Sequence, residues 1–177
     1  MKIKNMLFGI KLRMCKSPLK IAELYKKTGI QMGSNCEIFG TAKLGSEPYL
    51  IKLGNNVKIT SEVEFVNHDG GVYVLRNLKL LENADLFGRI TIGNNVFIGH
   101  GAIIMPNVNI GNNCVIGAGS IVTKNVEDNS VVAGVPAKKI KSIDEYYQKL
   151  KDKVDYTKSM NYHDKKQYLL KKYEGKI

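Results

Sequence analysis

The sequence predicts a mainly β fold in which short parallel strands coil into a stack, and three observations support this. Large apolar residues return every six positions at Ile92, Ile98, Ile104, Ile110, Ile116 and Val122. Smaller residues stand four positions after the first five, at Val96, Ala102, Val108, Cys114 and Ser120. Glycine directly follows four of the large residues, at Gly93, Gly99, Gly111 and Gly117. A repeat of fixed period is typical of solenoid proteins.

A period of six fits neither an α-helix nor an alternating strand, but it fits short strands joined by tight turns. Each hexad then supplies one brief strand whose large residue points inward, and Gly-Asn-Asn segments supply the turns. Three hexads close one coil of about eighteen residues, as in other solenoids. Stacked coils therefore place Ile92 over Ile110 and Ile98 over Ile116.

A weaker copy of the repeat precedes this region. It runs through Met32, Ile38 and Leu44 and, after a three-residue insertion, through Leu53, Ile59 and Phe65. The hexads stop at Phe65 and resume at Ile90 or Ile92. The segment 66–89 begins with the residues VNHDGG and is too long for a turn. We expect it to loop outward from the stack.

The two ends of the chain differ from the repeat region. Residues 1–29 have helix-like spacing, and Ser17-Pro18 suits a break between two helices. Residues 142–177 fit one or two amphipathic helices, and Ser142 with Glu145 fits a capping box. The predicted organisation is an N-terminal helical segment (1–29), a β-helix domain (30–141) with the loop 66–89, and a C-terminal helical tail (142–177).

Composition restricts the functions that are open to the chain. The net charge of +11 over 177 residues indicates an anionic partner, which could be a nucleic acid, a membrane surface or a phosphorylated ligand. No nucleic-acid-binding motif is present, so we expect no nucleic-acid partner. Three cysteines without a CxxC pair fit a reducing, cytoplasmic setting. No run is long enough to span a membrane, although the basic ends leave peripheral contact with its inner face open.

The region from Ile90 to Lys141 resembles the hexapeptide-repeat acyltransferases. The segment that carries the likeness reads IGNNVFIGHGAIIMPNVNIGNNCVIGAGSIVTKNVEDNSVVAGVPAKKI. It is most similar to the maltose, galactoside and polysaccharide O-acetyltransferases. The resemblance implies a left-handed parallel β-helix, acetyl-CoA as co-substrate, and a homotrimer with active sites between subunits.

The resemblance also implies a catalytic base. His68 lies where these O-acetyltransferases carry a catalytic histidine, at the start of a loop that interrupts the coils. Histidine suits the removal of a hydroxyl proton near neutral pH. Its second ring nitrogen needs an acceptor, for which Asp69 is one candidate and Glu62, Glu64, Glu82 and Asp85 are alternatives. The remaining candidate acceptor-binding residues are Asn67, Tyr73, Arg76 and Asp85.

Further residues match the donor side of the family's site. The candidates for contact with coenzyme A are His100, Ala118, Thr123, Lys124, Ala133, Lys138 and Lys141. His100 departs from the family pattern, which has a small residue there, and a solvent-facing turn is its alternative role. Lys138 and Lys141 fall where relatives place basic residues near the phosphates, and a solvated basic face is their alternative.

The expected function is acetyl transfer from acetyl-CoA to a sugar hydroxyl, in surface polysaccharide synthesis. Two alternatives remain, an N-acetyltransferase for an amino sugar or nucleotide sugar and a non-catalytic structural β-helix. A β-helical carbonic anhydrase needs three histidine ligands, and the repeat region holds only His68 and His100, so no metal is expected. Serine acetyltransferase is disfavoured because that family has a large helical N-terminal domain.

Overall fold

The computed structural model describes residues 2–174, with side chains from Phe8 onward. The chain divides into two compact units, Met1–Tyr146 and Tyr147–Ile177, which are described separately. The first unit contains the β-helix and the helices before it. The second contains a basic helical tail. Within residues 2–174, no helix combines the length and the apolar character that crossing a membrane requires.

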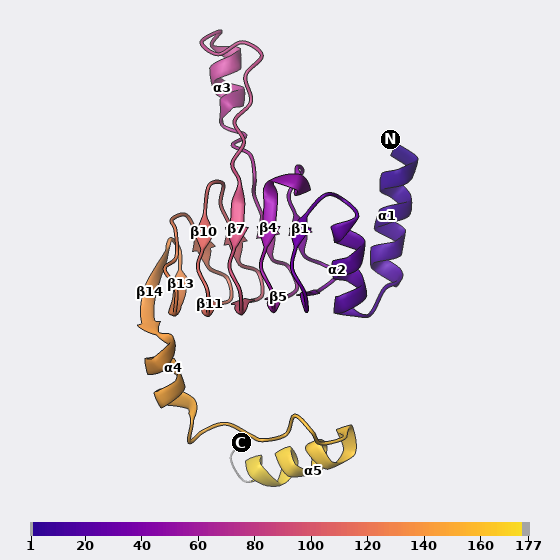
Figure 1. Ribbon diagram of the computed structural model, residues 1–177, viewed down its shortest axis with the longest axis vertical. Helices are drawn as coiled ribbons and strands as arrows, with labels where there is room; N and C mark the ends of the chain where they lie inside the picture. The colour runs from indigo at the N-terminus through magenta and orange to yellow at the C-terminus, as the bar shows by residue number, and fades with distance from the viewer. Residues whose placement is uncertain (1, 175–177) are drawn as a thin grey trace. The chain divides into compact units, whose positions relative to one another are not determined.

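The β-helix is built from three sheets whose strands pair in parallel, apart from one antiparallel pair at the end of the second sheet (Figure 1). Each of the first four coils contributes one strand to every sheet. The first sheet contains β1 (Gln31–Met32), β4 (Ile51–Leu53), β7 (Ile90–Ile92) and β10 (Asn109–Ile110). The second contains β2 (Glu37–Ile38), β5 (Val57–Ile59), β8 (Val96–Ile98), β11 (Cys114–Ile116), β13 (Ser130–Gly134) and β14 (Ala137–Ser142). The third contains β3 (Lys43–Leu44), β6 (Glu64–Phe65), β9 (Ile103–Ile104) and β12 (Ile121–Val122).

The strand register confirms the stacking that the six-residue period predicts. Ile92 pairs with Ile110 across the first sheet, and Ile98 pairs with Ile116 across the second. All four side chains are buried, so each coil adds one layer of like apolar residues to the core. The predicted fold class is confirmed, because the fold is mainly β, a parallel β-helix with helical segments at both ends.

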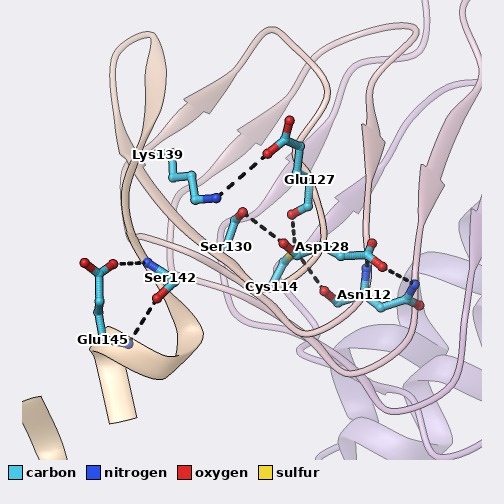
Figure 2. Close-up of polar contacts among 8 residues, drawn as sticks. All are labelled: Asn112, Cys114, Glu127, Asp128, Ser130, Lys139, Ser142 and Glu145. Atoms are coloured by element: carbon cyan, nitrogen blue, oxygen red, sulfur yellow. Dashed lines mark hydrogen bonds and ion pairs between the residues drawn. The ribbon is translucent and has the colours of Figure 1, made fainter. Parts of the chain in front are cut away.

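The turns between the first and second sheets are held by asparagine ladders. Asn95 and Asn113 have φ angles of 55°, a left-handed conformation that asparagine tolerates better than most residues. The side-chain amide of Asn94 donates to Oδ1 of Asn112 at 3.0 Å. The backbone N–H of Asn112 donates to Oδ1 of Asp128 at 2.7 Å (Figure 2). The carboxylate of Asp128 thus ends the ladder at the last coil.

Asp128 is expected to make stability depend on pH. Hydrogen bonds from the backbone and side-chain amides of Asn112 hold the pKa of the Asp128 carboxyl below the ordinary value. The stabilisation is therefore fully present above the pKa of an unfolded aspartate, about 3.9, and is lost as pH falls through the lowered folded pKa. Urea unfolding between pH 5 and 3 should show a smaller loss of stability for Asp128→Asn than for the wild type. Equal losses would contradict this role.

The first coil is covered by two helices, α1 (Lys2–Met14) and α2 (Pro18–Lys26), and the predicted break at Ser17-Pro18 separates them. The hydroxyl of Tyr25 donates to the carbonyl of Ala42 at 2.8 Å. The ring of Phe8 packs edge-on against Tyr25, with centroids 5.5 Å apart. These contacts close the N-terminal end of the core.

The last coil is closed by the antiparallel pair β13 and β14, and α4 (Ile143–Leu150) follows directly. Ser142 and Glu145 form the predicted capping box (Figure 2), since Ser142 N–H donates to Glu145 Oε2 at 2.6 Å and Glu145 N–H donates to Ser142 Oγ at 3.1 Å. In the second unit, α5 (Tyr162–Tyr173) begins at the side-chain cap Asn161.

Candidate functional site

The loop that interrupts the repeat leaves the β-helix between β6 and β7 and stands out from it (Figure 1). Its outgoing and returning segments are joined at the root by an isolated antiparallel bridge between His68 and Phe87. The N–H of Gly88 donates to the carbonyl of Asn67 at 2.9 Å. The short helix α3 (Val72–Asn77) lies farther along the loop. The backbone of His68 is therefore fixed by the solenoid on one side and by the returning strand on the other.

The imidazole of His68 is exposed and faces a hydroxyl of the preceding coil. Its Nδ1 lies 3.4 Å from Oγ of Ser46. Ser46 belongs to the insertion that precedes β4, where the short 3-10 helix η1 (Pro48–Leu50) replaces a regular turn. The insertion therefore supplies the group beside the histidine ring.

The buried side-chain amide of Asn67 holds the insertion that carries Ser46. Asn67 is 0% exposed, and its Nδ2 donates to the carbonyl of Glu47 at 2.7 Å. Ser46 Oγ donates to Asn67 Oδ1 at 3.4 Å. Buried amides need such partners, so Asn67 ties the insertion to the root of the loop. It stands behind His68 and not on the open surface.

The geometry permits His68 to act as a base. In the tautomer in which Nδ1–H donates to the oxygen of Ser46, Nε2 carries the lone pair. Because the side chain is exposed, Nε2 can meet an acceptor hydroxyl without moving a covering residue. A lone pair in this position can accept a proton from that hydroxyl.

The other predicted residues of the loop have structural contacts of their own. Oδ1 of Asp69 accepts from the N–H of Gly71 at 2.8 Å, next to the start of α3. Nη1 of Arg76 lies 2.6 Å from Oδ1 of Asp85, and this ion pair joins α3 to the returning strand. Tyr73 is 62% exposed. Orientation of His68 by Asp69, and substrate contacts by this group, stay predictions.

A second group of predicted residues gathers at the corner between the second and third sheets. The strand register aligns Ile59, Ile98, Ile116 and Val132. His100 comes two residues after Ile98, and Ala118 comes two residues after Ile116. Ala133 directly follows Val132. Ala133 pairs in turn with Lys138 of β14. His100, Ala118, Ala133 and Lys138 are thus brought to one corner.

This corner is bare of side chains over part of its length. Gly101 and Gly119 have φ angles of 67° and 66°, and a Cβ added to either would meet no atom within 4 Å. His100 Nδ1 lies 3.0 Å from Oγ of Ser61, so a serine of the preceding coil faces this imidazole as well. The corner offers open space beside exposed backbone.

The structure does not bring all predicted donor-side residues to this corner. Thr123 and Lys124 follow β12, so they lie at the same edge of the third sheet as His68, which follows β6. Lys141 pairs with Val131, farther along β14 than Lys138. Within one chain, the third sheet separates the two histidines, because His68 comes three residues after the end of β6 and His100 comes three residues before the start of β9.

Sequence reasoning missed Ser46 and Ser61, the two serines that face the histidines. Both contacts join residues of neighbouring coils, 22 and 39 positions apart. The one available signal was the insertion after Leu44, because an extra segment between coils has to project at a corner. In residues 2–174, no three histidine, cysteine, aspartate or glutamate side chains form a group that could hold a metal ion.

Comparisons with known proteins agree with this architecture. A family model described as bacterial transferase hexapeptide (six repeats) matches residues 89–124. Protein CapG of Staphylococcus aureus is 54% identical over 151 residues, which are 84% of this chain and 87% of that protein.

Solved structures of acetyltransferases have the same fold. A galactoside acetyltransferase in complex with coenzyme A matches with a TM-score of 0.61 and 29% identity, over 82% of this chain and 82% of that chain. A maltose O-acetyltransferase from Clostridium difficile 630 matches with a TM-score of 0.55 and 25% identity, over 77% of this chain and 83% of that chain. With the repeat match and the likeness to CapG, these findings show that the chain belongs to the bacterial hexapeptide-repeat transferase family and is an acyltransferase.

Proposed function

We propose that the chain transfers an acetyl group from acetyl-CoA to a sugar hydroxyl, with a surface polysaccharide or its precursor as the acceptor class. The observation that carries the proposal is the exposed imidazole of His68, which faces Ser46 at the point where the repeat breaks. The sugar acceptor is supported by the fold shared with a galactoside and a maltose acetyltransferase.

The corner of His100 fits the donor. Coenzyme A has a long, thin arm, and such an arm needs open space along the protein surface. Gly101 and Gly119 leave that space, and Ala118, directly before Gly119, is exposed. Lys138 is exposed at the same corner and could attract the phosphates as a point charge.

In the proposed reaction, His68 removes the proton from the acceptor hydroxyl through Nε2 while the hydroxyl oxygen attacks the thioester carbon. Ser46 holds the opposite edge of the ring and so fixes the orientation of the imidazole. Acetyl-CoA supplies the acetyl group and a thiolate leaving group. The protonated His68 then returns its proton to that thiolate, so the chain needs no serine or cysteine nucleophile.

The separation of the two corners supports an assembly with the active site between subunits. His68 lies at one edge of the third sheet, and the corner of His100 and Ala118 lies at the other. A homotrimer of parallel prisms would bring the first edge of one copy to the second edge of its neighbour. The cytoplasm, where acetyl-CoA is made, is the proposed location.

The function is tested by thiol release from acetyl-CoA with a panel of acceptors. The panel should contain sugars with free hydroxyls, amino sugars and nucleotide-linked amino sugars. Acetylation of a hydroxyl, established by mass spectrometry and by loss of the acetyl group in mild alkali, would support the proposal. Acetylation only at an amine would replace it with the N-acetyltransferase alternative. Absence of both thiol release and coenzyme A binding would favour the structural β-helix.

The donor corner is tested separately by Ala118→Phe. The new ring would occupy the open space beside Gly119, so we expect KM for acetyl-CoA to rise by about tenfold or more, which corresponds to about 1.4 kcal/mol of lost binding. The matched control is Val115→Phe on the outer face of β11. If both variants have the wild-type KM for acetyl-CoA, the donor does not use this corner.

A further inference from the structure

The positive charge of the chain is concentrated in the helices that cover the first coil. Residues 1–28 contain eight lysines and arginines and one acidic residue, Glu23. Residues 29–141 contain ten basic and nine acidic residues, which nearly cancel. Most of the net charge of +11 therefore lies on the helical cap formed by α1 and α2. Binding of coenzyme A at the β-helix would not account for positive charge at this place.

Apolar side chains lie exposed among these positive charges. On the inner side of α1, Phe8 and Leu12 pack against the core. On its outer side, Ile10 is 46% exposed and Met14 is 78% exposed. Leu19, at the start of α2, is 51% exposed.

A shallow groove runs between the two helices. Its volume is about 530 Å³, and it is lined by Lys11, Met14, Cys15, Lys20, Glu23 and Leu24. Its lining is mostly apolar, and it also includes two lysines and the carboxylate of Glu23. We call the surface formed by this groove together with Ile10 and Leu19 the cap surface.

We infer that the cap surface binds peripherally to a membrane that contains anionic phospholipids. Nucleic acid would engage the lysines but would leave Ile10, Met14 and Leu19 in water. A membrane interface satisfies both kinds of group, because the lysines meet lipid phosphates while the apolar side chains enter the boundary of the acyl chains. Each basic residue near such a surface strengthens binding about fivefold. This inference does not depend on the proposed acetyl transfer.

Binding to vesicles tests the inference without any enzymatic substrate. We expect the full-length protein to co-sediment with phosphatidylglycerol vesicles at least tenfold more tightly than with phosphatidylcholine vesicles. The preference should weaken as salt rises from about 0.05 to 0.5 M, because salt screens the phosphates. The double variant Lys11→Gln with Lys20→Gln should bind phosphatidylglycerol about tenfold more weakly or worse. Met14→Ser should weaken binding about tenfold through its apolar contribution alone.

The matched control is Lys165→Gln with Lys166→Gln, which removes the same charge from α5 in the second unit. This variant should bind vesicles within about twofold of the wild type. Equal binding by the wild type and the cap variants would overturn the inference, as would a loss caused only by the α5 variant. Release of single subunits by the cap variants on size exclusion, with vesicle binding unchanged, would assign the surface to a second copy instead.

Discussion

Replacing His68 by alanine is expected to lower kcat for sugar acetylation by about 10²–10⁴-fold, the range typical for loss of a general base. The side chain is exposed, so its removal leaves no cavity in the core, and the fold should persist. Acetyl-CoA binding should also be retained, because the proposed donor contacts come from the corner of His100 and Ala118 and not from the imidazole of His68. Steady-state thiol release and coenzyme A titration on the same preparation measure the two effects separately.

The matched control is His100→Ala. This histidine is also exposed and also faces a serine through Nδ1, but it lies at the donor corner, where we expect an effect on KM for acetyl-CoA and little effect on kcat. The reverse result, in which His100→Ala loses kcat and His68→Ala does not, would exchange the roles of the two histidines.

Ser46→Ala separates orientation from proton transfer. Without the hydroxyl, the imidazole of His68 loses its partner at Nδ1, and we expect kcat to fall by about tenfold, much less than for His68→Ala. Wild-type kcat in Ser46→Ala would show that another group orients the ring, with Asp69 the first candidate.

The six-residue period of the sequence was sufficient to predict the stacked coils, because the period follows from which side chains are buried. Ile92 and Ile110 repeat at the spacing of one full coil, and apolar side chains at that spacing can be buried together only if the coils stack in register. The break after Phe65 likewise predicted the outward loop, since a coil cannot absorb the extra residues between β6 and β7.

The environment of His68 could not be predicted in the same way. Ser46 is brought to the imidazole by an insertion in the preceding coil, and the local pattern does not show how an insertion folds at a corner. Adjacency in sequence made Asp69 one candidate for orienting the ring, and that role stays a prediction. In the structure, Oδ1 of Asp69 accepts from the N–H of Gly71, so its carboxylate has a role within the loop. Residues that neighbour each other along a strand point to opposite faces.

Substituting Gly93 by alanine is expected to destabilise the β-helix by about 3 kcal/mol or more. A Cβ at Gly93 would lie 2.7 Å from both the carbonyl carbon and the oxygen of Gly111 in the next coil. These Gly111 atoms are backbone and cannot turn aside. Directly next to them, the N–H of Gly93 donates to the carbonyl of Ile110 at 2.8 Å. A methyl group can be accommodated only if two coils move apart, which weakens the ladder and the packing of the core between them.

Gly9→Ala is the matched control because it adds the same methyl group in α1, where a Cβ would meet nothing within 4 Å. A glycine in a helix costs about 0.5–1 kcal/mol relative to alanine, so this variant should be slightly more stable than the wild type. Urea unfolding followed by circular dichroism measures both changes on one scale. The two variants should therefore shift the midpoint in opposite directions. If Gly93→Ala unfolds at the wild-type midpoint, the spacing between coils is looser than the distance of 2.7 Å implies, and glycine at this corner is not required for stacking.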